Sequence, residues 1–201
     1  MTDYFALFEE PRKPWLDADS LKQKFLSLSA TVHPDRIHNA AEAEKAEASR
    51  RYAELNAAYQ CLAEPKSRLR HLLELELGSK PTDVQQIPPG LADLFAEVAA
   101  ACREADGFLR EKGRATAPLL QAGLFERGQQ WVERLNALQK KLNGLRDKVT
   151  DELKTLDGKW AVTTAATRPE MLPSLEELYR WFGYFNRWNQ QIQERIVQLS
   201  L

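Results

Sequence analysis

The C-terminal half of the chain carries an almost unbroken seven-residue repeat of apolar residues. The apolar side chains recur mostly at spacings of three and four, at Trp131, Leu135, Leu138, Leu142, Leu145, Val149 and Leu156. This spacing places them on one narrow stripe of a long helix. Such a stripe is buried by packing against other helices, so this half of the chain predicts a helical bundle.

Two more helices are predicted on either side of this one. A helix starts at Leu91 and fades near Gly113, with Leu94, Phe95, Val98 and Cys102 on its apolar face. Residues 157–173 hold a glycine, two prolines and several β-branched residues, so we predict a long loop there, with Ser174 capping the final helix. The apolar stripe of that helix contains Leu175, Leu178, Phe182, Phe185, Ile192, Ile196 and Leu199. The three helices predict an antiparallel three-helix bundle.

The N-terminal part predicts a helical hairpin. A short helical turn from Asp3 to Phe8 precedes a second helix, which Asp17, Asp19 or Ser20 can cap. The apolar face of that second helix has a 4-3-4 spacing, at Leu21, Phe25, Leu28 and Val32. Pro34 ends this helix because proline disrupts a helix interior. A third helix is predicted from about Ala41 to Leu62, antiparallel to the second.

A fourth helix and a linker complete the N-terminal part. Pro65 suits the first turn of a helix that runs to Leu77 and stops at Gly78. The segment from Gly78 to Gly90 contains three prolines and is typical of a linker.

Composition excludes several classes of protein. Hydrophobic residues make up 43% of the 201 residues and charged residues 28%, with no apolar run long enough to cross a bilayer. The start, Met1-Thr2-Asp3, lacks the basic residues of a signal peptide. Two distant cysteines, Cys61 and Cys102, indicate neither disulfides nor a zinc ribbon. We therefore expect a cytoplasmic protein, and the net charge of −1 argues against a nucleic-acid partner.

The tripeptide His33-Pro34-Asp35 lies in the connection between the second and third predicted helices. Pro34 has no N–H and a restricted φ, so it stiffens the connection, while His33 and Asp35 present polar groups outward. A rigid polar tip loses little conformational entropy when it docks on a partner. The hairpin therefore predicts a protein-binding loop.

Three further segments strengthen a resemblance to a known family. They are Asp3-Tyr4-Phe5-Ala6-Leu7-Phe8, Leu55-Asn56-x-Ala58-Tyr59-x-x-Leu62-x-x-Pro65 and Pro65-x-x-Arg68-x-x-x-Leu72-Leu73. Together with the tripeptide, they resemble the HscB family, the J-domain co-chaperones of iron–sulfur cluster assembly. The resemblance covers nearly the whole chain and is strongest over residues 3–77. It implies an all-α protein with a J-domain at 1–78, a linker at 79–90 and a client-binding three-helix bundle at 91–201.

The resemblance also implies a chaperone-binding site. His33, Pro34 and Asp35 would contact the nucleotide-binding domain and linker of a DnaK/HscA-type chaperone and stimulate its ATPase. Family members usually carry basic residues on the second helix before this loop, whereas here that stretch reads Leu28-Ser29-Ala30-Thr31-Val32. Lys22, Lys24 and Arg36 are the candidate cations that remain. The chain itself would perform no catalysis, and we expect no cofactor or metal.

A client-binding face is implied on the bundle, with an iron–sulfur scaffold protein as the client. Leu94, Phe95 and Val98 match the apolar positions of the family, Glu97 and Glu104 keep some of its negative charge, and Trp181 falls at an aromatic contact position. Other acidic positions are replaced, as Ala99, Ala100 and Cys102 show.

Alternatives remain open at this point. Leu94, Phe95 and Val98 have the spacing of bundle core, and the aromatic residues Trp181, Tyr184 and Trp188 could pack in the same way. The chain could be a general J-protein with a different client, or a structural helical adaptor with a degenerate J-domain. An enzyme is the least favoured class, because no set of nucleophile, base and acid can be assembled.

The remaining polar residues receive structural interpretations. His71 is expected to be partly buried and structural. Lys66, Arg68 and Arg70 form a basic cluster, which predicts a solvated face or, alternatively, a contact with phosphate or an acidic partner. His33, His38 and Cys61 fit no familiar metal-site spacing.

Overall fold

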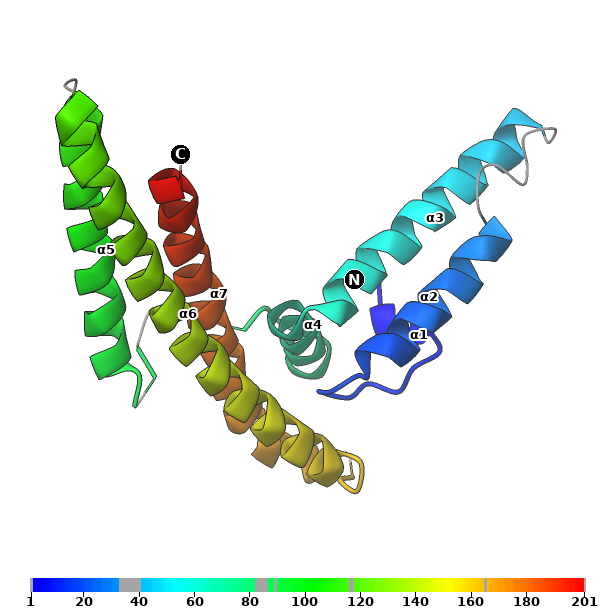
Figure 1. The fold of residues 1–201 in the computed structure, drawn as a ribbon. Coiled ribbons are helices and arrows are strands. Elements are labelled where there is room, and N and C mark those ends of the chain that lie inside the picture. Colours follow the sequence, from blue (N-terminus) through cyan, green and yellow to red (C-terminus); the bar gives the residue numbers. More distant parts are fainter. Residues whose placement is uncertain are drawn as a thin grey trace. The chain divides into compact units, whose positions relative to one another are not determined.

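The computed structural model describes residues 2–32, 41–81, 87–88, 90–115, 118–164 and 166–200. Within these ranges every regular element is helical and no residue lies in a strand (Figure 1). The predicted all-α fold is thereby confirmed. Contacts divide the chain into two compact units, Met1–Thr82 with Glu152–Tyr179, and Asp83–Asp151 with Arg180–Leu201.

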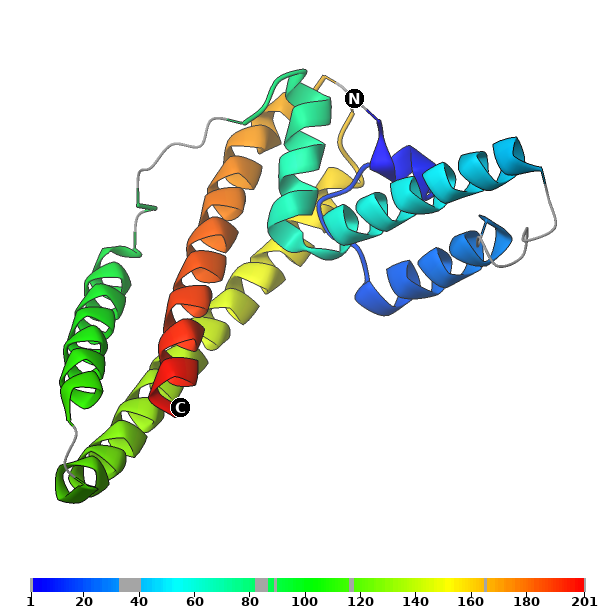
Figure 2. The ribbon, with the colours of Figure 1, turned by 90° about the horizontal axis from the view of Figure 1, so that it is seen from above.

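The first unit contains the predicted hairpin. Helix α1 (Tyr4–Leu7) is capped by Asp3, whose carboxylate accepts hydrogen bonds from the Phe5 and Ala6 amides. Helices α2 (Ala18–Val32) and α3 (Glu42–Ala63) lie antiparallel and side by side in both views (Figures 1 and 2). They are joined across their interface by stacked rings of Phe25 and Tyr59, with centroids 4.6 Å apart.

Helix α4 (Pro65–Leu77) has the predicted bounds. The Glu64 carboxylate accepts hydrogen bonds from the Lys66 and Ser67 amides, and Gly78 ends the helix at φ 69°, a left-handed conformation that glycine adopts at little cost. Fully buried side chains near the N-terminus of this unit lie in or next to α1, α3 and α4 and include Phe5, Phe8, Leu62, Leu69, Leu72 and Leu73. This core is the base from which the hairpin projects.

The end of α6 and the segment after it also belong to the first unit. The Trp160 indole N–H donates to the Arg12 carbonyl at 2.8 Å, and the Trp15 amide donates to the Asp157 carboxylate at 3.1 Å. These bonds hold the connection between α1 and α2 against the end of α6. The first change of unit along the chain, after Thr82, falls within the predicted linker at 79–90, whereas residues 152–179 of the predicted bundle group with the first unit. The predicted domain bounds stay a prediction.

The second unit is built from α5 (Ala92–Arg114) with parts of α6 (Pro118–Trp160) and α7 (Leu172–Ser200). Its core follows the predicted stripes and includes Leu94, Val98, Ala105, Phe108, Leu135, Leu142, Phe185 and Ile192. No helix in the described ranges combines the length and apolar character needed to cross a membrane.

The predicted loop at 157–173 is wrong at both ends. Helix α6 continues to Trp160, a 3-10 helix η2 covers Arg168–Met171, and α7 begins at Leu172, so Ser174 is not its cap. Tertiary contacts explain the first error, because Trp160 is buried and bonded to Arg12. The second arises because Pro173 is accommodated in the first turn of a helix, where its missing N–H costs nothing.

Three ion pairs connect α5 to α6 in a constant antiparallel register. Glu97 pairs with Lys141, Glu104 with Arg134, and Glu111 with Arg127. The glutamates are seven residues apart along α5, and the cations are seven residues apart in the opposite direction along α6. Each side chain is about half exposed, so each pair contributes only modestly to stability. Their repeat favours this register over a shifted one.

Reversing one charge of this series tests its role. Lys141→Glu places two carboxylates together, and we expect the free energy of unfolding to fall by about 0.5–1 kcal/mol at low salt. The double variant Lys141→Glu with Glu97→Lys should recover most of that loss, and both effects should shrink at high salt. Urea unfolding measures them, and a double variant no more stable than Lys141→Glu alone would show that the pair contributes nothing.

Candidate functional site

The predicted chaperone-binding tripeptide, His33-Pro34-Asp35, is called the trigger below. The loop that carries it lies outside the described residues. His33, Pro34, Asp35 and Arg36 fall in the range 33–40, as does His38. The structure describes the two helices on either side of them: α2 ends at Val32 and α3 begins at Glu42. These two ends lie next to each other at one end of the hairpin (Figure 2).

The two predicted cations on α2 differ in their surroundings. Lys22 is exposed. The Lys24 ammonium donates to the Glu9 carbonyl and to the Glu10 carboxylate, both at 3.1 Å. Glu9 has φ 51°, an uncommon conformation for a residue with a side chain, so Lys24 holds the strained turn after α1. Lys24 therefore has a structural partner, whereas Lys22 is open to solvent.

Arg68 does not belong to a basic surface cluster, contrary to the prediction. Its side chain is buried, donating from Nε to the Pro14 carbonyl at 2.8 Å and from Nη1 to the Leu62 carbonyl at 2.5 Å. Burial lowers the pKa of Arg68 to about 10. The signal that could have revealed it is its position four residues before Leu72, on the apolar stripe of α4.

The other two members of that basic cluster point elsewhere. Lys66 lies over the Tyr179 ring, with its ammonium 5.5 Å from the ring centroid, and Arg70 pairs with Glu74 at 2.9 Å. The predicted single basic face, solvated or phosphate-binding, is therefore wrong, because the three side chains leave α4 in different directions and have separate contacts.

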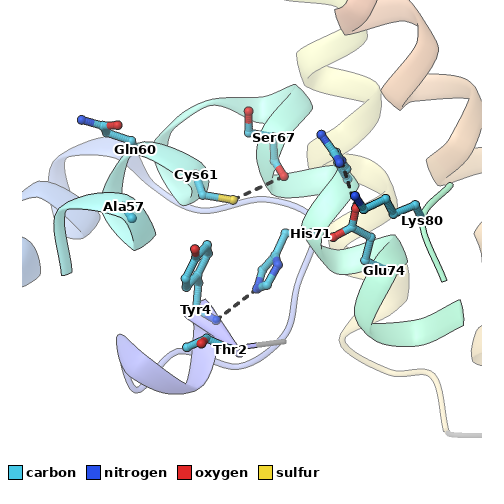
Figure 3. Close-up of a pocket in the computed structure, with 10 residues that line it drawn as sticks. Thr2, Tyr4, Ala57, Gln60, Cys61, Ser67, His71, Glu74 and Lys80 are labelled. Atoms are coloured by element: carbon cyan, nitrogen blue, oxygen red, sulfur yellow. Dashed lines mark hydrogen bonds and ion pairs between the residues drawn. The ribbon is translucent and has the colours of Figure 1, made fainter. Parts of the chain in front are cut away.

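His71 has a structural role, as expected, and is more deeply buried than the sequence predicts. Its Nε2 accepts a hydrogen bond from the Tyr4 amide at 3.0 Å (Figure 3). Its ring lies against the rings of Tyr4 and Phe5. This bond satisfies an amide at the start of α1 that has no partner within the helix. Burial lowers the pKa of His71, so the neutral imidazole that can accept the bond is favoured.

His71 predicts a dependence of stability on pH. Its pKa is lower in the folded chain than the ordinary value of 6.5, so the unfolded chain binds a proton more readily. The stabilisation is therefore complete above pH 6.5 and is lost as the pH falls through the folded-state pKa. Between about pH 7.5 and about pH 5.5, urea unfolding should show a larger loss of stability for the wild type than for His71→Gln. Equal losses would exclude His71 as the source.

Cys61 lines the same cavity as His71, a space of about 570 Å³ between α1, α3 and α4 (Figure 3). Its thiol donates to the Ser67 carbonyl at 3.5 Å, and burial raises its pKa to about 11. The thiol is therefore protonated at neutral pH, and a protonated thiol is a poor nucleophile and a poor metal ligand.

The predicted client residues on α5 point in different directions. Leu94 and Val98 are buried in the core of the second unit, whereas Phe95 is 42% exposed. The Phe95 ring lies 6.3 Å from that of Trp188 on α7, and Trp188 in turn lies 5.3 Å from Tyr184. Phe95 thus forms the exposed edge of an aromatic cluster that joins α5 to α7.

Trp181 and Glu97 complete the predicted client residues. Trp181 is partly exposed and packs beside Phe185, with ring centroids 5.7 Å apart. Glu97 is paired with Lys141 of α6, and Glu104 with Arg134. The structure brings Phe95 close to aromatic residues of α7, while both glutamates have cationic partners on α6.

The chain is similar to known proteins in part of its sequence and in its fold. No family model matches the chain. Proteins described as co-chaperone protein HscB homologues match over 72 residues in Bordetella avium, with 42% identity, and in Paraburkholderia phymatum, with 40%. The matched segment is 36% of this chain and only 43% and 41% of those relatives. The chain therefore matches less than half the length of these relatives.

Solved structures show the same fold over almost the whole chain. Chaperone HscB from Vibrio cholerae aligns with a TM-score of 0.59 and 20% identity over 96% of both chains. Human co-chaperone HscB aligns with a TM-score of 0.55 and 20% identity over 96% of this chain and 82% of that one. The chain thus has the same all-helical fold as these proteins. The predicted resemblance to HscB is confirmed in part of the sequence and in the fold.

Proposed function

We propose that this chain is a J-domain co-chaperone of the HscB type. It stimulates the ATPase of a DnaK/HscA-type chaperone through His33, Pro34 and Asp35. The observation that carries this proposal is the antiparallel hairpin of α2 and α3, whose connection contains these three residues. The HscB fold of the chain and its similarity to HscB co-chaperones support the same conclusion.

The hairpin suits this role because its base is rigid. Three sets of hydrogen bonds fix this base. Arg68 donates to the Pro14 and Leu62 carbonyls, the Tyr4 amide donates to His71, and Lys24 donates to the Glu9 carbonyl. A loop presented by a rigid hairpin loses little entropy on docking. Lys22 is exposed on α2 and, with Arg36 in the loop, would steer the hairpin toward an acidic chaperone surface.

The direct experiment is a titration of the chaperone's ATPase. Increasing amounts of this chain should raise the steady-state hydrolysis rate of the DnaK/HscA-type chaperone of the same organism to a plateau. A rate that stays at the basal value over the whole titration would overturn the proposal and favour the structural adaptor with a degenerate J-domain.

The second unit would bind the client, an iron–sulfur scaffold protein. Phe95 and Trp181 are the predicted contacts with exposed area, and large aromatic side chains at exposed positions are typical anchors of protein interfaces. Leu94 and Val98 are buried and would support this face from within. Glu97 would take part only by exchanging Lys141 for a cation of the client.

Phe95→Asp tests the client face. We expect it to weaken scaffold binding about tenfold or more, because it replaces an apolar anchor by a charge. Val197→Asp is the matched control, since Val197 is 50% exposed elsewhere in the second unit, and it should leave the affinity unchanged. Calorimetric titration with the scaffold protein measures both. Equal affinities for the two variants would favour the general J-protein with a different client.

A further inference from the structure

A second apolar surface lies where α5 leads into α6. Leu120 is 61% exposed and Phe125 is 67% exposed, although both are large and apolar. Leu120, but not Phe125, lines a groove of about 400 Å³ together with Glu111, Arg114, Gly123, Leu124 and Arg127. It lies about 28 Å from Phe95, counted as the rise of α5 from residue 95 to residue 114. The groove is therefore separate from the proposed client face.

The charges at this groove are not balanced. Glu111 accepts two hydrogen bonds from the Arg127 guanidinium, at 2.6 and 3.0 Å, so its charge is compensated. Arg127 also lies over the Phe108 ring, 5.0 Å from its centroid. Arg114 is exposed and makes no ion pair with any other residue that the structure describes. The lining contains two arginines, Arg114 and Arg127, and one glutamate, Glu111, so its net charge is +1.

We propose that this groove is a docking surface for an acidic amphipathic segment of a partner protein. The apolar side chains of the segment would cover the exposed Leu120 above the buried Leu124, and a carboxylate beside them would pair with Arg114. Exposed apolar area with a polar rim is typical of interaction sites, and arginine recognises carboxylates through parallel hydrogen bonds. The excess positive charge selects an acidic segment over a basic one.

Substitution of Gly123, which lines the groove, tests the proposal. A Cβ atom added at Gly123 meets no other atom within 4 Å, and the same is true of Gly144, which is exposed on the same helix and does not line the groove. The Cβ of Gly123→Leu therefore has open space, and the rest of the side chain would occupy the groove. Gly144→Leu is the matched control. Both changes raise helix propensity, so neither variant should unfold.

Binding is measured by fluorescence anisotropy with two labelled helical peptides of about three turns. Both carry leucines at i, i+3, i+4 and i+7, flanked by glutamates in one peptide and by lysines in the other. The full chain should bind the acidic peptide about tenfold or more tightly than the basic one. Gly123→Leu should remove this binding, Gly144→Leu should keep it, and Arg114→Glu should reverse the preference.

Three outcomes would overturn the proposal. The first is equal binding of the two peptides, or no binding of the acidic one. The second is binding of the acidic peptide that Gly123→Leu leaves unchanged. The third is self-association of the wild-type chain in sedimentation that Gly123→Leu abolishes, which would identify a second copy of this chain as the occupant.

Discussion

Replacing Arg68 by alanine is expected to lower the free energy of unfolding by about 3 kcal/mol or more, because each hydrogen bond to a buried charged group contributes about 1.5–3 kcal/mol. The side chain bonds to the Pro14 and Leu62 carbonyls. Its loss would leave both carbonyls without this donor and a cavity beneath α4. The connection before α2 and the turn between α3 and α4 would lose their common anchor.

Arg70→Ala is the matched control on the same helix. Arg70 is about half exposed and pairs with Glu74 within one turn, so its replacement should cost less than about 1 kcal/mol. Urea unfolding, followed by far-ultraviolet circular dichroism, compares the two variants. Equal losses of stability would contradict the account of Arg68 as a buried anchor, and Arg68→Lys should restore only part of the stability because lysine lacks the guanidinium fork.

The helices were predictable because their signals are local. α4 has the predicted bounds, since Pro65 and Gly78 mark its two ends in the sequence itself. The hairpin follows from the 4-3-4 spacing in α2, and the stripe from Trp131 to Leu156 lies within α6. Apolar periodicity and end signals determine such elements almost without help from the rest of the chain.

The predictions fail where contacts between residues far apart in the sequence determine the structure. Trp160 extends α6 by bonding to Arg12, which is 148 positions away in the sequence. Arg68 looks like a surface cation until Pro14, 54 positions away, is brought beside it. The role of Glu97 as a client contact stays a prediction, but its ion pair with Lys141 follows only from the register of α5 against α6. Local pattern gives no information about these pairings.

Few cations on α2 are free to attract an acidic chaperone surface. Lys24 is held by Glu9 and Glu10, and the α2 stretch before the loop carries no cation, so Lys22 on α2 and Arg36 in the loop are the candidate cations that remain. Docking would therefore depend heavily on the loop itself. Asp35→Asn removes the negative charge at nearly unchanged shape, and we expect it to abolish most of the stimulated ATPase activity while leaving the unfolding free energy unchanged. Asp19→Asn is the matched control, since Asp19 is an exposed aspartate in the first turn of α2.

The role of the His33-Pro34-Asp35 loop can be measured as the single-turnover ATP hydrolysis rate of the DnaK/HscA-type chaperone with saturating wild type, Asp35→Asn or Asp19→Asn. We predict strong stimulation by the wild type and by Asp19→Asn, and a rate near the basal value with Asp35→Asn. Stimulation by Asp35→Asn equal to that of the wild type would contradict the role of the His33-Pro34-Asp35 loop as the trigger.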